Sequence, residues 1–361
     1  AKPEFVNDII AMSIKKKLGL DLDFKKYRLK AEQILRSELD DNQDVNINQI
    51  YEKFAEITGL SAGVCNEIKG LEIQEELNLC TPRKELVEWF NFAKDLPKKI
   101  ILVSDMYLQS DVVSKILAKC GIKDYNKLYI SSETNLRKDN KTIWEYLKVL
   151  NVNASLIHIG DNERSDWQYP TDEKFNAYHV MSSFNLFENT AFGSYFLHNY
   201  QLNTFSAVLL GPIFAYKFNS PFEFNKNKYF VKNFYELGYI IYGPILTYYM
   251  LWLIKETTTN KHEGIWFLAR DGYFLKPLYE KICKWLNIKA LPSEYLLASR
   301  RAASVASFKN VNELYDLLDI PYKGTIKDFV FVRYGLVLDN SKYNQKIELP
   351  NDREILKKII E

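Results

Sequence analysis

The sequence predicts an α/β fold built on a parallel sheet, and the passage from Lys98 to Asp166 carries that prediction. It opens on the apolar run Ile100–Val103 and closes on the apolar run Leu156–Ile159. Both runs are short and rich in β-branched residues, and each is followed by a small residue and a carboxylate. Buried strands of parallel sheets have this pattern, and ligands bind beyond the carboxyl ends of such strands.

Between these two strands the pattern predicts further alternation of helix and strand. We expect a helix over Ser110–Cys120, a strand over Leu128–Ser131 and a second helix over Thr142–Leu150, preceded by Lys138. Strands that alternate with helices of this length are typical of parallel sheets with crossover helices.

Three short motifs in this passage resemble those of the haloacid dehalogenase (HAD) superfamily of phosphotransferring hydrolases. They are VSDMYL at the first strand, the lysine at position 138, and HIGDNERSD at the last strand. Within the superfamily they look like a bacterial branch found with surface-polysaccharide genes. The resemblance implies a HAD-like Rossmannoid parallel sheet with a helical cap.

The resemblance also implies roles for individual residues. Ser104 would hydrogen-bond a phosphoryl oxygen, and Lys138 would neutralise the phosphoryl group and the nucleophile. Asp161 would bind Mg²⁺, with Asp166 supporting the metal site. The neighbouring side chains of Asp105 and Asn162 are expected to contact substrate.

The chemistry of these residue types agrees with that assignment. Phosphoryl transfer needs positive charge near the phosphoryl oxygens, a hydrogen-bond donor and a hard cation held by carboxylates. Mg²⁺ prefers one or two carboxylates together with waters and substrate oxygens, and a lysine at a helix start makes a good anion site. The plainer interpretation of Asp161 and Asp166 is a turn followed by helix capping. Lys141 remains a rival to Lys138.

The nucleophile of the superfamily is absent from this sequence. It is the first Asp of an Asp-x-Asp-x-Thr motif on a central strand that should precede Lys98. Asp21-Leu22-Asp23 has the spacing but follows a lysine-rich helix, and Asp23 is expected to cap the next helix. We therefore expect either a piece of a longer protein or a member that lacks its nucleophile.

We expect residues 1–97 to form a mostly helical segment in the position of the cap. We expect residues 98–195 to form the HAD-like core. Residues 196–361 predict a second, mostly helical α/β domain. Two apolar passages there contain Gly-Pro, at Gly211-Pro212 and Gly243-Pro244. We interpret them as buried helices broken at these positions rather than as a membrane span.

The second domain carries an FLARDG motif and an SRR motif, each after a predicted strand. Their charged residues are Arg270 and Asp271 in the first motif and Arg300 and Arg301 in the second. Arginines at strand ends suit a phosphate or carboxylate, so we expect them to bind substrate. An internal Arg–Asp ion pair that joins the two loops is the alternative.

Composition limits the class of protein. The formal net charge of +2 argues against a nucleic-acid partner. The four cysteines show no paired spacing, no Cys-x-x-Cys occurs, and no signal peptide opens the sequence. We therefore expect reduced thiols and a cytoplasmic location.

The sequence thus predicts a Mg²⁺-dependent phosphohydrolase whose nucleophilic Asp lies outside these residues. Its substrate would be a small phosphorylated metabolite, and the resemblance suggests a sugar or polyol phosphate. The alternative is a catalytically inactive HAD-like scaffold or binding module in surface-polysaccharide biosynthesis.

Overall fold

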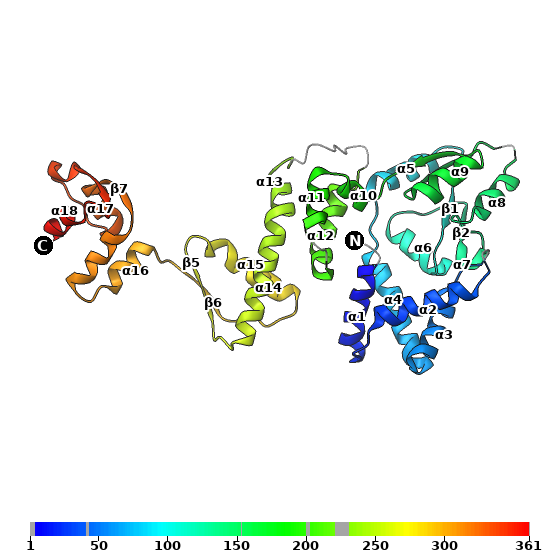
Figure 1. Cartoon of the computed structure of the whole chain (residues 1–361), viewed down its shortest axis with the longest axis horizontal. Helices are drawn as coiled ribbons and strands as arrows, with labels where there is room; N and C mark the ends of the chain where they lie inside the picture. The colour runs from blue at the N-terminus through cyan, green and yellow to red at the C-terminus, as the bar shows by residue number, and fades with distance from the viewer. Residues whose placement is uncertain (1–3, 41–42, 153, 200–202, 221–230, 361) are drawn as a thin grey trace. The chain divides into compact units, whose positions relative to one another are not determined.

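The protein is an α/β protein in which helices predominate and the parallel sheets are small (Figure 1). The computed structural model describes residues 4–40, 43–152, 154–199, 203–220 and 231–360. The chain forms two compact units, Ala1–Pro244 and Ile245–Glu361. Hydrophobic clusters lie within each unit. The boundaries that we predicted at residues 97 and 195 lie inside the first unit, and they stay predictions.

In the described residues the first unit begins with five helices, and capping residues close to their ends in the sequence define where several of them begin. They are α1 (Glu4–Leu18), α2 (Phe24–Glu38), α3 (Ile47–Thr58), α4 (Ala62–Leu79) and α5 (Lys84–Lys94). The Asp23 carboxylate accepts a hydrogen bond from the Lys26 amide, which confirms the predicted cap of α2. Asn46 and Gln49 form a reciprocal capping box at the start of α3, and Gly59 ends that helix in the left-handed conformation.

The passage from Lys98 to Asp166 has the predicted alternation. Its elements, and those that follow directly, are β1 (Ile101–Ser104), α6 (Ser110–Lys119), β2 (Lys127–Ile130), α7 (Ser131–Thr134), α8 (Thr142–Leu150), β3 (Ile157–Gly160), the π-helical η1 (Glu163–Gln168), α9 (Tyr169–Asp172) and β4 (Asn176–His179). Strand β1 pairs with β2 in parallel, and β3 pairs with β4 in parallel. The predicted parallel pairing of short apolar strands is confirmed.

The two strand pairs of this passage are separate two-stranded sheets, and β1 is not hydrogen-bonded to β3 in the described residues. Both pairs nevertheless pack on α8. Val103 of β1 and Leu156, next to β3, lie against the cluster that contains Trp144 and Leu147. On β3, Ile157 is 65% exposed and Ile159 is 42% exposed. An apolar strand with exposed side chains and one unpaired edge is unusual in a parallel sheet.

Helices α1 to α4 share one hydrophobic cluster with the first strand pair. Phe24, Phe54 and Ile68 belong to the same cluster as Val112 of α6 and Ile130 of β2. All five side chains are buried. The helical segment is therefore packed on the β1–β2 part of the core through a common interior.

The rest of the first unit is helical and corrects one prediction. It contains α10 (Ser183–Glu188), α11 (Ala191–Asn199), α12 (Thr204–Lys217), α13 (Phe234–Leu237) and the π-helical η2 (Gly238–Tyr242). Pro212 lies inside α12. In the second passage η2 leads directly into α14 (Gly243–Thr259). The predicted breaks at Gly-Pro are therefore wrong. The π-helical turn η2 lies just before Pro244. Its wider turn accommodates this proline without ending the helix.

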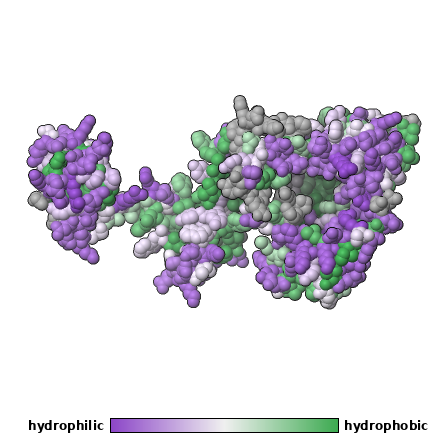
Figure 2. Space-filling model, viewed as in Figure 1, coloured by the Kyte–Doolittle hydropathy of each residue, from purple (hydrophilic) through white to green (hydrophobic). Residues whose placement is uncertain are grey.

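The predicted burial of the second Gly-Pro passage is also wrong. Residues Phe234–Thr259 form one helix, and only 11% of its most apolar stretch is buried. In the described part of the chain it is the one helix long and apolar enough to cross a membrane. Figure 2 shows hydrophobic residues at the surface in the part of the view where Figure 1 places α13.

The second unit contains two strands where the sequence predicts them, and they form a further parallel pair. Strand β5 (Ile265–Leu268) pairs with β6 (Ser293–Leu296), and α15 (Gly272–Trp285) connects them. The remaining elements are α16 (Arg300–Ser307), η3 (Val311–Asp319), β7 (Tyr322–Thr325), α17 (Ile326–Tyr334), η4 (Ser341–Asn344), β8 (Lys346–Leu349) and α18 (Arg353–Ile360). Strands β7 and β8 form an antiparallel pair that the sequence analysis did not predict.

Candidate functional site

The candidate site begins where β1 ends. Ser104 is the last residue of the strand, and Asp105 follows it. Both carboxylate oxygens of Asp105 lie 3.1 Å from the backbone nitrogen of Lys138, which donates to them. The loop before α8 is thereby held against the carboxyl end of β1.

The structure separates Lys138 from its rival Lys141. The Lys138 ammonium lies 2.7 Å from Oδ1 of Asp166, and the Lys138 side chain is 16% exposed. Lys141 instead pairs with Asp172 on α9, at 2.8 Å. Helix α8 begins at Thr142 as predicted, with Lys141 as its N-cap, so Lys138 precedes the helix and is not part of its first turn. Lys138 lies in the turn before the helix.

Asp166 is a buried carboxylate, and both of its side-chain oxygens contact polar groups. Its Oδ1 lies 3.1 Å from Nε2 of His158, in addition to the contact with Lys138, and its Oδ2 accepts from the Asn162 amide. Burial by itself raises the pKa of Asp166, but the hydrogen bonds from His158 and Lys138 and the lysine charge outweigh burial. The pKa of Asp166 is therefore held well below its ordinary value, and the group stays ionised.

Gly160 makes the approach of Asp166 possible. A Cβ atom at Gly160 would lie 2.4 Å from Cγ of Asp166 and 2.7 Å from its Oδ2. The small residue at the end of β3 is thus a packing requirement of the site.

Asp161 differs from Asp166 in being exposed to solvent. Its backbone oxygen lies 3.0 Å from Nε2 of His179, so the main chain is held. Its carboxylate makes no hydrogen bond or ion pair with any residue that the structure describes. The side-chain oxygen of Asn162 accepts from the Arg164 and Ser165 amides as the cap of η1.

The side chains available as ligands limit how a metal ion could be bound at this site. Among the described residues, no three His, Cys, Asp or Glu side chains are grouped as a metal site. Mg²⁺ needs fewer protein ligands, since waters and substrate oxygens complete its shell. The exposed carboxylate of Asp161 fits that requirement. Both oxygens of Asp166 are already engaged, so it fits a supporting position better than direct coordination.

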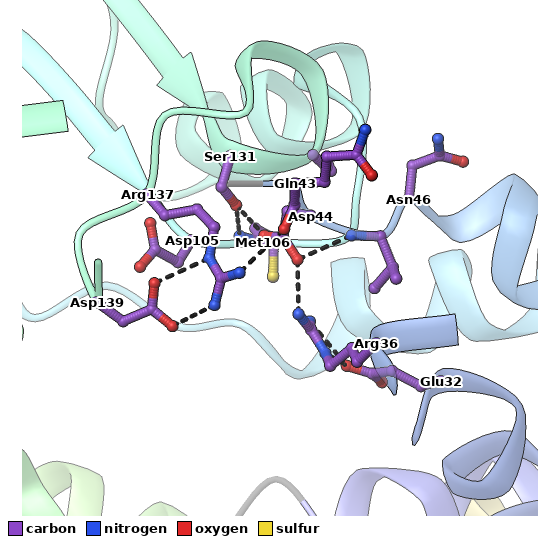
Figure 3. A network of polar contacts seen from close by, with 12 residues as sticks. Glu32, Arg36, Gln43, Asp44, Asn46, Asp105, Met106, Ser131, Arg137 and Asp139 are labelled. Atoms are coloured by element: carbon purple, nitrogen blue, oxygen red, sulfur yellow. Dashed lines mark hydrogen bonds and ion pairs between the residues drawn. The ribbon is translucent and has the colours of Figure 1, made fainter. Parts of the chain in front are cut away.

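The sequence analysis missed two parts of this site. It did not include His158 among the candidate residues, although His158 lies on the same side of β3 as Gly160, and side chains alternate along a strand. It also missed the network in which Asp44 reaches Ser131 and Met106 (Figure 3). Nothing in the sequence around Asp44 marks that contact.

The candidate residues of the second unit are arranged differently. Arg270, Asp271 and Arg300 are exposed. Nη1 of Arg301 donates to the Phe331 carbonyl oxygen at 3.0 Å, and its guanidinium lies 5.2 Å from the Phe331 ring centre. Arg301 therefore anchors α16 to α17. Within the described residues no ion pair joins these arginines to Asp271, so the alternative of an internal Arg–Asp pair is not formed.

The chain matches no protein-family model and no curated protein.

Proposed function

We propose that these residues belong to a Mg²⁺-dependent phosphohydrolase of the HAD type that acts on a small phosphorylated metabolite. The nucleophilic Asp would come from outside residues 1–361. The observation that carries the proposal is the position of Lys138, whose ammonium contacts Asp166 beyond β3 while its amide binds Asp105 beyond β1. The carboxyl ends of two separate strand pairs thereby meet at one lysine.

The charges at this place support a cation and a phosphoryl group. Three carboxylates follow the strands here, Asp105 after β1 and Asp161 and Asp166 after β3, and the Lys138 ammonium contacts that of Asp166. An excess of negative charge at strand ends favours a divalent cation, and the cation in turn favours a phosphate. Mg²⁺ held by Asp161 would neutralise charge on the phosphoryl oxygens. In this proposal the Ser104 hydroxyl donates to one such oxygen, and the Lys138 ammonium lies beside the nucleophile.

The separation of β1 from β3 supports a missing strand between them. Both strands have an unpaired edge in the described residues, and both pack on α8. A parallel strand inserted between them would pair with both edges and end beside Lys138. The HAD resemblance implies a nucleophile strand in that position. The sugar or polyol phosphate and the polysaccharide setting rest on the resemblance alone, and the cytoplasmic location rests on the unpaired spacing of the cysteines.

The test is phosphate release from an aryl phosphate with Mg²⁺, followed by a panel of sugar and polyol phosphates. The chain would be compared as it stands and with the upstream residues of its parent protein added. We expect activity in the extended chain, and removal of Mg²⁺ with a chelator should abolish it.

Two matched variants of the extended chain sharpen this test. Lys138→Ala should lower kcat by about 10²-fold or more, the usual cost of losing one charge-stabilising donor. Lys141→Ala removes an equal charge three positions away, where the side chain pairs with Asp172, and should leave kcat nearly unchanged. Equal effects of the two variants would contradict the proposal. Absence of activity in every form would favour the inactive scaffold.

A further inference from the structure

The segment Gln43–Asn46 directly precedes α3 and lies against the loops that carry the candidate site (Figure 3). Its central residue is Asp44, whose side chain is only 3% exposed. A carboxylate is buried at this level only where partners replace its hydration. The identity of those partners shows what the buried charge holds in place.

The first partners belong to the helical segment itself. Oδ1 of Asp44 lies 2.6 Å from Nη1 of Arg36 and accepts from the Val45 amide at 2.8 Å. Arg36 is held in turn by Glu32, one turn earlier on α2. These contacts fix the direction of the Asp44 side chain relative to α2.

The remaining oxygen of Asp44 points at the core. The hydroxyl of Ser131, which is fully buried at the end of β2, donates to Oδ2 of Asp44 at 2.5 Å. The same hydroxyl oxygen accepts from the Met106 amide at 2.9 Å. Met106 is the residue after Asp105, so the line from Asp44 through Ser131 orients the Asp105–Met106 peptide. The Ile47 amide donates to the Tyr107 carbonyl oxygen and adds a second attachment to this loop.

The same segment also holds the loop of Lys138. The Asp44 amide donates to the Asn135 side chain at 3.3 Å, and Nη1 of Arg137 donates to the Gln43 carbonyl oxygen at 2.9 Å. Arg137 also grips Asp139 with its other nitrogen atoms. The residues on both sides of Lys138 are thereby attached to the Gln43–Asn46 segment.

We infer that Asp44 is a positioning residue of the candidate site, and that the Gln43–Asn46 segment fixes the Asp105 loop and the Lys138 loop relative to one another. The helical segment is then a rigid part of the site, to which both loops are attached. The inference rests on the proposed function for the meaning of the site, but the ordering of the loops is measurable without any activity.

The test uses amide hydrogen exchange of the full chain, read by mass spectrometry over residues 104–109 and 135–141. Asp44→Ala should speed exchange in both stretches about tenfold or more, the effect of losing a buried charge-assisted hydrogen bond on a local opening equilibrium. Exchange in α8 and in the second unit should stay unchanged. Labelling of the Lys138 amine with an acylating reagent should also accelerate, with Lys141 as the internal reference.

Two further variants control for a general loss of stability. Asp44→Asn keeps an oxygen acceptor for Ser131 and should give a smaller change confined to the same two stretches. Asp21→Asn removes a carboxylate that is 86% exposed and should change neither stretch. Unchanged loops in both Asp44 variants, or exchange that rises equally throughout the first unit, would overturn the inference.

This outcome is independent of the phosphatase test. A chain that is inactive with every phosphate but shows loosened loops keeps the inference and loses the proposed function. An active chain whose loops do not respond to Asp44 keeps the proposed function and loses the inference.

Discussion

At the scale of single residues, the candidate site depends on short contacts among charged groups. Asp166 is 2% exposed and is stabilised as an anion by Lys138, His158 and the Asn162 amide. Its burial is compatible with ionisation only because every partner is present. Gly160 leaves the space that this carboxylate occupies. Both features make predictions that a stability measurement can check.

The depressed pKa of Asp166 predicts a pH dependence. A carboxyl whose folded pKa lies below its unfolded value of 3.8 contributes stability above that value and loses it as pH falls toward the folded pKa. We therefore expect the free energy of unfolding to fall more steeply between about pH 5 and 3 in the native protein than in Asp166→Asn. Urea denaturation at a series of pH values measures both slopes. Parallel curves would show that Asp166 is not stabilised as an anion in the fold.

Gly160→Ala should destabilise the protein, because the new methyl group would overlap the Asp166 carboxylate. The expected cost is about 1–3 kcal/mol, typical of a forced overlap in a packed interior. Gly70→Ala is the matched control, since a Cβ there meets nothing within 4 Å and the position lies inside α4. That variant should be neutral or stabilising. The denaturation midpoint should therefore fall for Gly160→Ala and stay in place or rise for Gly70→Ala.

At the scale of elements, a buried ion pair joins two helices of the helical segment. Arg28 of α2 contacts Glu72 of α4 through Nε and Nη2, and their side chains are 3% and 1% exposed. The Tyr51 hydroxyl donates to the same carboxylate at 2.6 Å, and Arg28 lies 4.7 Å from the ring centre of Tyr107. Burial alone would lower the pKa of Arg28, but Glu72 raises it above its ordinary value. The pair therefore sets which faces of α2 and α4 meet.

Removal of one partner should be costly. Among the described residues, Glu72→Ala leaves the buried Arg28 charge with Glu32 as its ion-pair partner, and we expect the free energy of unfolding to fall by about 3–5 kcal/mol. Asp21→Ala, which breaks an exposed pair with Lys15, should leave it nearly unchanged. Thermal denaturation of the three proteins provides the comparison. A similar loss in both variants would mean that the burial of the pair has no energetic consequence.

At the scale of the whole molecule, each compact unit has interior clusters of its own. The largest cluster of the first unit includes Ile68, and a cluster of the second includes Phe329. Both side chains are 0% exposed. Because each unit has its own core, each can unfold cooperatively without the other. A single transition midpoint would then not describe the unfolding of the protein.

We expect calorimetry to resolve two transitions. Ile68→Ala should lower the stability of one by about 2–5 kcal/mol, and Phe329→Ala should lower the other by about 3–5 kcal/mol, from lost contacts and the cavities left behind. Each variant should leave the transition of the other unit at its original temperature. A single transition that shifts with either substitution would show that the units unfold together.

The sequence by itself determined the local elements of this protein. Short β-branched runs, cap residues and helical periodicity predicted β1, β2 and β3, the cap at Asp23 and the α/β class, because those signals act between residues close in the chain. Only the tertiary structure decided that Lys138 meets Asp166 while Lys141 meets Asp172. It also decided that Asp44 reaches Ser131, 87 residues away, and that the Gly-Pro helix is exposed. Such pairings depend on which distant surfaces pack together, and neither spacing nor composition specifies that.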